Sequence, residues 1–203
     1  MTTSENIDCE MPGISITEIK KLLVSTGELT IGNDFLKIVN YPFEPSIAYR
    51  QETFSSNQID DIDFKSYPPT IRIGDELIFI SSKKKSELEI FASKNNIKTT
   101  KRPNIWGWIL EPFLDTEFTI ERDQQLAQLL ESYGLSIENV QYLRAEVATQ
   151  MVKFNFDTML WEWVSFNASD VLCAMRVKYN KEEFRAFYKR VMTIALLTKT
   201  DAE

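Results

Sequence analysis

The chain has 203 residues, of which 43% are hydrophobic and 26% charged, a composition typical of a globular domain with one substantial core. Its net charge of −7 argues against general nucleic-acid binding, because contacts to phosphates require a basic face. There is no histidine, which excludes Ser-His-Asp and Cys-His nucleophile systems and histidine-ligated metal centres within this chain. The six glycines are isolated from one another, so neither a P-loop nor a G-x-G-x-x-G turn is present.

No apolar run approaches the roughly 18 residues that a membrane span requires. The polar start of the chain also lacks the basic and then apolar layout of a secretory signal, so we expect a cytoplasmic protein without membrane contact. Cys9 and Cys173 are the only cysteines, and a structural disulfide between a tail and a helix has little support.

The expected fold class is α+β, with a small strand-containing N-terminal half packed on a mainly helical C-terminal half. Residues 1–13 are polar and are predicted to form a mobile tail. Residues 14–199 are predicted to form a single globular domain, made of an α/β-rich half at 14–102 and a helical half at 103–199.

In the first half, a capping box at Ser15–Glu18 predicts a helix that begins at Ile16 and ends at Gly27. From Glu28 to Phe54, β-branched and aromatic residues separated by turn residues favour short strands. The polar segment from Ser55 to Pro69 resembles a surface loop.

The next two elements are predicted from turn and capping residues. Residues 70–81 are predicted to form a hairpin with a turn of about three residues around Gly74. Ser86–Glu89 forms a second capping box and predicts a helix that ends near Asn96.

The stretch Asn104–Asp123 combines two tryptophans with five carboxylates, as no other window does. Trp106 and Trp108 carry more apolar area than a loop leaves in water, so we expect them to contribute to the core. Pro112 fits the first turn of a short helix, and Thr119 is predicted to be the N-cap of the next helix.

Beyond Thr119 the chain is predicted to be helical. An apolar stripe precedes Gly134, and Ser136 caps a long second helix. Residues 157–166, which include Trp161 and Trp163, fit a helix better than a strand, and these tryptophans fit core packing better than a recognition surface. A short helix follows Asn167, and a box at Asn180–Glu183 begins an amphipathic helix that closes the core.

Charge is divided into blocks along the chain. Residues 1–81 carry a net charge of −7, residues 82–102 of +5, residues 103–175 of −8 and residues 176–203 of +3. Two interpretations of the basic block from Lys83 to Arg102 remain open. It either pairs with acidic blocks inside the fold, which is the simpler interpretation, or forms a binding patch.

Two functions remain after these exclusions. The first is a non-enzymatic protein of the acidic inhibitor or immunity-protein type, which needs no cofactor and binds a protein partner. A partner with a basic surface would best complement the acidic chain. Its candidate contact residues are Trp106, Trp108, Glu111, Asp115 and Glu117.

The alternative is a divalent-metal-dependent enzyme or ligand-binding protein that uses the carboxylates of Glu111–Asp123. Mg²⁺ and Ca²⁺ take carboxylate oxygens as ligands, although the spacing does not match an EF-hand loop. The candidate metal ligands are Asp115, Glu117 and Glu121.

Overall fold

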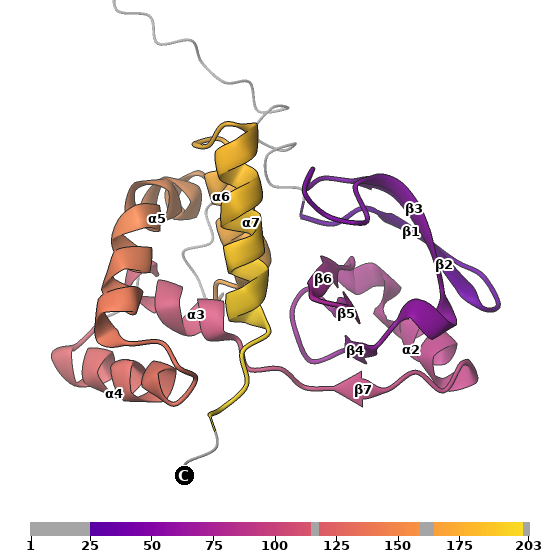
Figure 1. Cartoon of the computed structure of the whole chain (residues 1–203), viewed down its shortest axis with the longest axis horizontal. Helices are drawn as coiled ribbons and strands as arrows, with labels where there is room; N and C mark the ends of the chain where they lie inside the picture. Colours follow the sequence, from indigo (N-terminus) through magenta and orange to yellow (C-terminus); the bar gives the residue numbers. More distant parts are fainter. Residues whose placement is uncertain (1–24, 115–117, 159–164, 201–203) are drawn as a thin grey trace, which may run out of the picture.

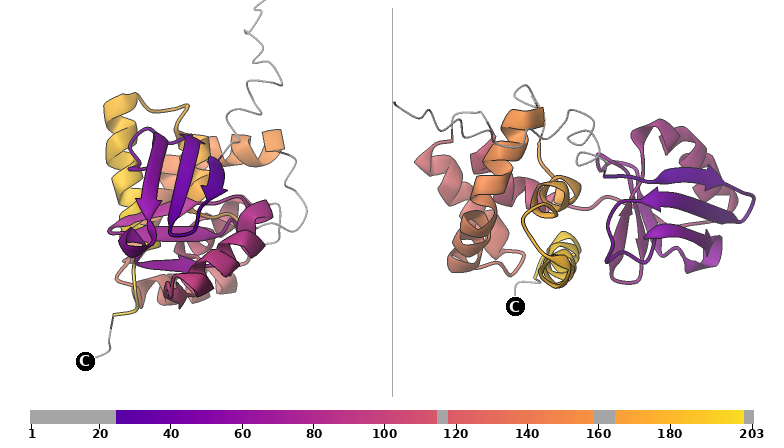
Figure 2. Two further views of the ribbon diagram at one scale, coloured as in Figure 1. Left: turned by 90° about the vertical axis from the view of Figure 1, so that its right-hand side faces the viewer. Right: turned by 90° about the horizontal axis from the view of Figure 1, so that it is seen from above.

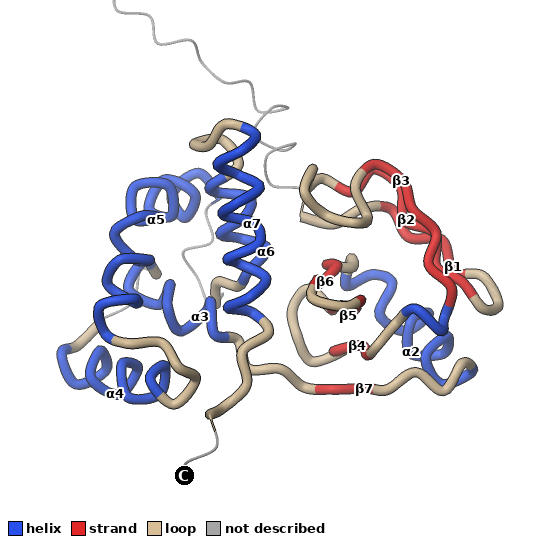
Figure 3. The backbone as a smooth tube through the Cα atoms, viewed as in Figure 1, coloured by secondary structure: helices blue, strands red, loops and turns tan. Residues whose placement is uncertain are grey.

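The computed structural model describes residues 25–114, 118–158 and 165–200. In these ranges the strands lie in one lobe and all but one of the α-helices lie in the other, and the two lobes sit side by side (Figure 1, Figure 3). The predicted α+β class is therefore confirmed, with strands in the first half of the chain and helices mainly in the second. The helix predicted to begin at Ile16 and the tryptophans Trp161 and Trp163 lie outside the described residues.

The β lobe begins with a three-stranded antiparallel sheet of order β1-β2-β3. Its strands are β1 (Glu28–Ile31), β2 (Phe35–Tyr41) and β3 (Arg50–Ser55). Leu29 is paired with Ile38 and Leu36 with Phe54, so these four side chains share the face that is buried. The strands predicted between Glu28 and Phe54 are confirmed.

The second sheet has four strands in the order β6-β5-β4-β7. It contains β4 (Asp61–Asp63), β5 (Thr70–Ile73), β6 (Glu76–Phe79) and β7 (Thr99–Thr100). The helix α2 (Lys85–Lys94) and the short 3₁₀ turns η1 (Ser56–Gln58) and η2 (Ser82–Lys84) complete this lobe.

The prediction of a surface loop from Ser55 to Pro69 is wrong at residues 61–63, which form β4, an interior strand of this sheet, whereas residues 64–69 connect β4 and β5 outside any strand. Both aspartates of β4 are buried, and Asp63 is 0% exposed. Asp61 is paired with two arginines, and Asp63 accepts hydrogen bonds from three backbone N–H groups. A buried carboxylate is stable only with such partners, which the local sequence does not reveal.

Two local predictions need smaller corrections. The hairpin of β5 and β6 is present, but Ile73 pairs with Glu76, so its turn contains only Gly74 and Asp75. Ser86 does not cap α2, because η2 leads directly into that helix and Lys84 occupies the N-cap position.

The helical lobe is made of α3 (Ile105–Leu110), η3 (Glu111–Phe113), α4 (Ile120–Glu131), α5 (Ile137–Thr158), α6 (Ala168–Met175) and α7 (Lys181–Ala195). The predicted N-caps Thr119, Ser136 and Asn180 each accept a hydrogen bond from a backbone N–H in the first turn of their helix. Within the described ranges, no helix is both long enough and apolar enough to cross a membrane.

The face of α7 that is turned toward the β lobe joins the two lobes (Figure 2). Phe43, in the loop after β2, is fully buried, and its ring lies 6.5 Å from that of Phe184 and 6.3 Å from that of Tyr188. The Tyr188 hydroxyl lies 3.2 Å from the Glu76 carboxylate at the start of β6. The interface between the lobes thus combines aromatic packing with a polar contact that helps to fix their relative position.

Candidate functional site

The tryptophans of the stretch Asn104–Asp123 anchor α3. Trp106 is only 1% exposed, and its Nε1 donates a hydrogen bond of 3.0 Å to the carbonyl of Val191 in α7. Trp108 is half-buried, and its ring lies 5.5 Å from that of Tyr133. The core role predicted for this pair is therefore present, with Trp106 buried and Trp108 partly buried and packed against the core.

Most described carboxylates of this stretch are engaged within the fold. Glu111 forms a two-pronged ion pair with Arg122, at 2.5 and 2.8 Å, and Asp123 lies 2.6 Å from Arg144. Among the residues that the structure describes, no three acidic or cysteine side chains are grouped to hold a metal ion. Asp115 and Glu117 lie outside the described residues, so the metal site and the partner contacts assigned to them remain predictions.

Glu121 belongs to a surface that we call the acidic face, on the exposed sides of α4 and α5. These two helices lie in contact on the side of the helical lobe away from the β lobe (Figure 1, Figure 2). We use this name for three exposed carboxylates and three exposed apolar side chains of the two helices, namely Glu121, Glu131, Glu138, Ile120, Ile137 and Tyr142. The exposed Arg122 of α4 is paired with Glu111. None of the three carboxylates has an ion-pair partner in the described part of the chain.

Helix geometry keeps two of these carboxylates charged. A hydrogen bond from its own backbone N–H and one from the Thr119 hydroxyl hold the pKa of Glu121 below its usual range. The same arrangement with Ser136 lowers the pKa of Glu138. Ile120 and Tyr142 remain 75% and 62% exposed on the same two helices. The face is therefore negative and partly apolar at neutral pH.

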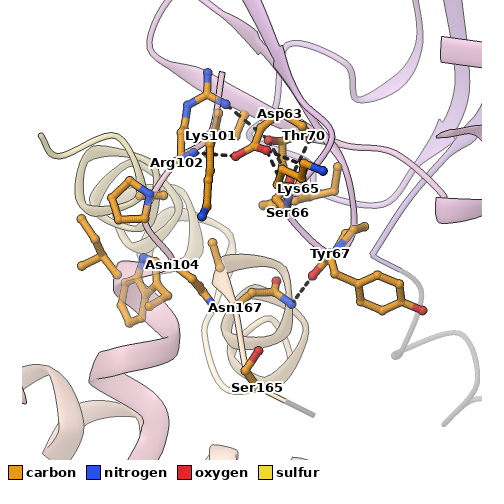
Figure 4. A pocket seen from close by; sticks show the side chains of 18 of the residues that line it. Asp63, Lys65, Ser66, Tyr67, Thr70, Lys101, Arg102, Asn104, Ser165 and Asn167 are labelled. Carbon is orange, nitrogen blue, oxygen red and sulfur yellow. Dashed lines mark hydrogen bonds between the residues drawn. The ribbon is translucent and has the colours of Figure 1, made fainter. Parts of the chain in front are cut away.

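A cleft of about 380 Å³ lies where the two lobes meet (Figure 4). The loop between β4 and β5, the strand β6, the linker at residues 101–104, the helix α3 and residues 165–168 form its walls. Its apolar lining is formed by Pro68, Leu77, Phe79, Pro103, Ile105, Trp106, Trp108, Ala168 and Ala195. Concave, mostly apolar sites with a few polar groups are typical of ligand pockets.

Asp63 shapes one wall of this cleft. Its Oδ1 accepts hydrogen bonds from the backbone N–H groups of Lys65, at 2.7 Å, and Ser66, at 3.1 Å. Its Oδ2 accepts one from the backbone N–H of Arg102, at 2.7 Å. Because one buried carboxylate binds both the loop and the linker, the two segments keep a fixed separation across the cleft.

Arg102 lines the cleft but is already occupied by the fold. Its Nη2 donates to Asp61, which also accepts from Arg72 Nε at 2.8 Å. Partial burial lowers the pKa of the Arg102 guanidinium from its ordinary value. The ion pair with Asp61 thus stabilises the sheet. The Arg102 guanidinium is occupied by this contact and contributes to the cleft only through its positive charge.

Two asparagines hold the opposite wall. Asn104 accepts from the Gly107 N–H at 3.0 Å and donates to the Phe166 carbonyl at 2.7 Å. Asn167 donates to the Tyr67 carbonyl at 3.0 Å and so joins the lobes across the cleft. The side-chain amides are therefore engaged in positioning the walls.

Lys65 and Lys101 differ from the other polar residues of the cleft. Neither ammonium group has a hydrogen-bond or ion-pair partner among the described residues, and both side chains are exposed. Lys101 extends from the linker into the cavity, whereas the ring of Tyr67 is turned away from it (Figure 4). These lysines are the cationic groups of the cleft that remain available to a ligand.

Sequence reasoning did not identify the cleft. Its residues come from five separate segments, and their meeting depends on how α7 packs on the β lobe. The available signal was the basic block from Lys83 to Arg102, in which Lys84 pairs with Glu87 and Arg102 pairs with Asp61. Pairing inside the fold thus holds for Lys84 and Arg102. Lys101 lines the cleft without an ion-pair partner among the described residues, and a binding role for the block stays a prediction.

Fold and site together define a two-lobed α+β protein with an interlobe cleft and an acidic outer helical face. Residues 100–202, half of the chain, match a family described as a domain of unknown function (DUF7079), and the chain belongs to that family. This match covers β7 in part, the linker and the helical lobe. No curated protein and no solved structure matches the chain.

Proposed function

We propose that this chain is a cytosolic, non-enzymatic protein-binding module of the acidic inhibitor or immunity-protein type. The observation that supports it best is the acidic face on α4 and α5, where Glu121, Glu131 and Glu138 have no ion-pair partner in the described part of the chain and lie on the same helices as exposed apolar side chains. Interfaces combine an apolar centre with a charged rim, and a negative face steers a basic partner toward it.

The internal ion pairs also favour binding over catalysis. Glu111, Asp123 and Glu146 are each held by an arginine, at 2.5 to 2.6 Å. A carboxylate that is paired with an arginine makes a poor general base, because the neighbouring positive charge stabilises its ionised form. The carboxylates of the acidic face have no ion-pair partner among the described residues, so their charge is available to a basic partner.

The test compares two triple charge reversals. In the first, Glu121→Lys, Glu131→Lys and Glu138→Lys change the acidic face. In the second, Glu52→Lys, Asp75→Lys and Glu89→Lys change three exposed acids of the β lobe, and this control has the same net charge. Each variant and the wild type are tagged and used to capture partners from the source cells, and the captured protein is then purified.

The proposal predicts a defined stoichiometric complex for the wild type and the control. Its dissociation constant should rise at least about tenfold in the first variant, and also when ionic strength is raised from about 0.05 to about 0.5 M. Equal affinity of the two triple variants for the purified partner would show that the acidic face is not the binding surface.

A further inference from the structure

We propose that the interlobe cleft is a binding site for a small organic anion that carries an apolar body, such as an aromatic or medium-chain carboxylate. This inference does not depend on the acidic face, because no residue of that face lines the cleft.

The size and the lining set the apolar part of the ligand. The volume of about 380 Å³ lies in the range of small-molecule pockets. Trp108 keeps part of its ring exposed, and Pro103 and Pro68 add rigid apolar surface on both sides. An aromatic or branched hydrocarbon body would bury this surface without the loss of a hydrogen bond.

The available charges set the polar part. The cleft is lined by Lys65, Lys101, Arg102 and one acid, Asp63. Asp63 and Arg102 are held by the contacts described above, and the two lysines have no described partner. A ligand carboxylate can form a charge-assisted hydrogen bond with a lysine, whereas a cationic ligand would meet two uncompensated ammonium groups.

The position of Lys101 makes it the main anchor. It belongs to the linker between the lobes, next to the residue whose backbone N–H is fixed by Asp63. Its backbone is therefore held in place, and its side chain points into the cavity (Figure 4). A backbone that is already ordered lowers the entropy cost of binding, although the lysine side chain itself must still be ordered.

The experiment titrates the 203-residue chain with two fluorescent probes of similar shape. One is the anion 8-anilinonaphthalene-1-sulfonate, and the other is its neutral relative N-phenyl-1-naphthylamine. Octanoate and octanol serve as a second charged and neutral pair, which is read by displacement. The variants are Lys101→Gln, Lys101→Arg and Lys65→Gln/Lys101→Gln, and the control is Lys98→Gln, an exposed lysine close to the cleft in sequence but not in its lining.

We expect saturable one-to-one binding of the anionic probe and its displacement by octanoate. Lys101→Gln should weaken binding of the anion about tenfold and the double variant further, while Lys101→Arg, Lys98→Gln and the neutral probe change little. Circular dichroism checks that each variant is folded. Binding of the anion that is unchanged in the double variant would overturn the proposal, and so would the absence of saturable binding by both anions.

Discussion

Asp63 gives the sharpest test of how the cleft is built. We expect Asp63→Ala to destabilise the protein strongly, because it leaves three backbone N–H groups without their acceptor. A hydrogen bond to a charged group contributes about 1.5–3 kcal/mol. Water can reach the exposed loop at Lys65 and Ser66, so those two bonds are expected to contribute about 1 kcal/mol each, and the one to Arg102 about 2 kcal/mol. The free energy of unfolding is therefore expected to fall by about 4 kcal/mol, a large part of the total of 5–15 kcal/mol that is typical of a domain.

The assay is urea unfolding at neutral pH, followed by tryptophan fluorescence and circular dichroism. Asp63→Asn keeps one acceptor oxygen but presents an amide N–H₂ to the Arg102 N–H, so we expect a loss of about 2 kcal/mol. Asp60→Ala is the matched control, since Asp60 is an exposed neighbour that accepts from Gly74 N–H and pairs with Arg72 at 3.5 Å. The free energy of unfolding of Asp60→Ala should be lower than that of the wild type by no more than about 1 kcal/mol. If Asp63→Ala costs no more than this control, the carboxylate does not hold the loop and linker together.

Four further outcomes are expected from the same structure. Burial raises the pKa of Asp170 to about 7 from 3.8, so the folded state holds an extra proton between those values, and the free energy of unfolding should fall by up to about 4 kcal/mol as pH rises from 4 to 8. This dependence should be absent from the unfolding free energies of Asp170→Asn, and its persistence there would contradict the assignment. Phe43→Ala should cost about 3–5 kcal/mol in urea unfolding, because its ring is buried among aromatic rings of both lobes. Gly107→Ala should lower the melting temperature, because a Cβ would lie 2.3 Å from Asn104 Nδ2 and 2.8 Å from the Phe166 carbonyl oxygen. Millimolar Mg²⁺, Ca²⁺ or Mn²⁺ should leave the melting temperature unchanged, and a saturable rise that is lost in Asp115→Asn would favour the metal-dependent alternative.

Local patterns predicted much of the helical lobe. Thr119, Ser136 and Asn180 were identified as N-caps from residue type and position, and each accepts the expected hydrogen bond. Capping depends on neighbours within one turn, so the sequence contains the whole interaction. Ser86 is the exception, because the 3₁₀ turn before α2 moves the start of the helix to Lys85.

The candidate sites were less accessible to sequence reasoning. The acids of Asn104–Asp123 were visible as a group, but the sequence did not show that Arg122 and Arg144 would engage Glu111 and Asp123. Arg144 lies in the next helix, so this pairing depends on how α5 packs against α4. The sequence identified Lys101 only as one lysine of a basic block. Its position in the cleft depends on how the two lobes pack together.

The sequence by itself determined the α+β class, the order of strands before helices and the exclusion of histidine chemistry. These properties follow from composition and from periodicities that act over a few residues. Only the tertiary structure decided that the polar segment around Asp61 and Asp63 is a buried strand, and that a cleft opens between the lobes. Both depend on contacts between distant residues, such as Asp63 with Arg102 and Phe43 with Tyr188. Burial of a charge is stable only when such a distant partner is supplied, and no local pattern records where that partner lies.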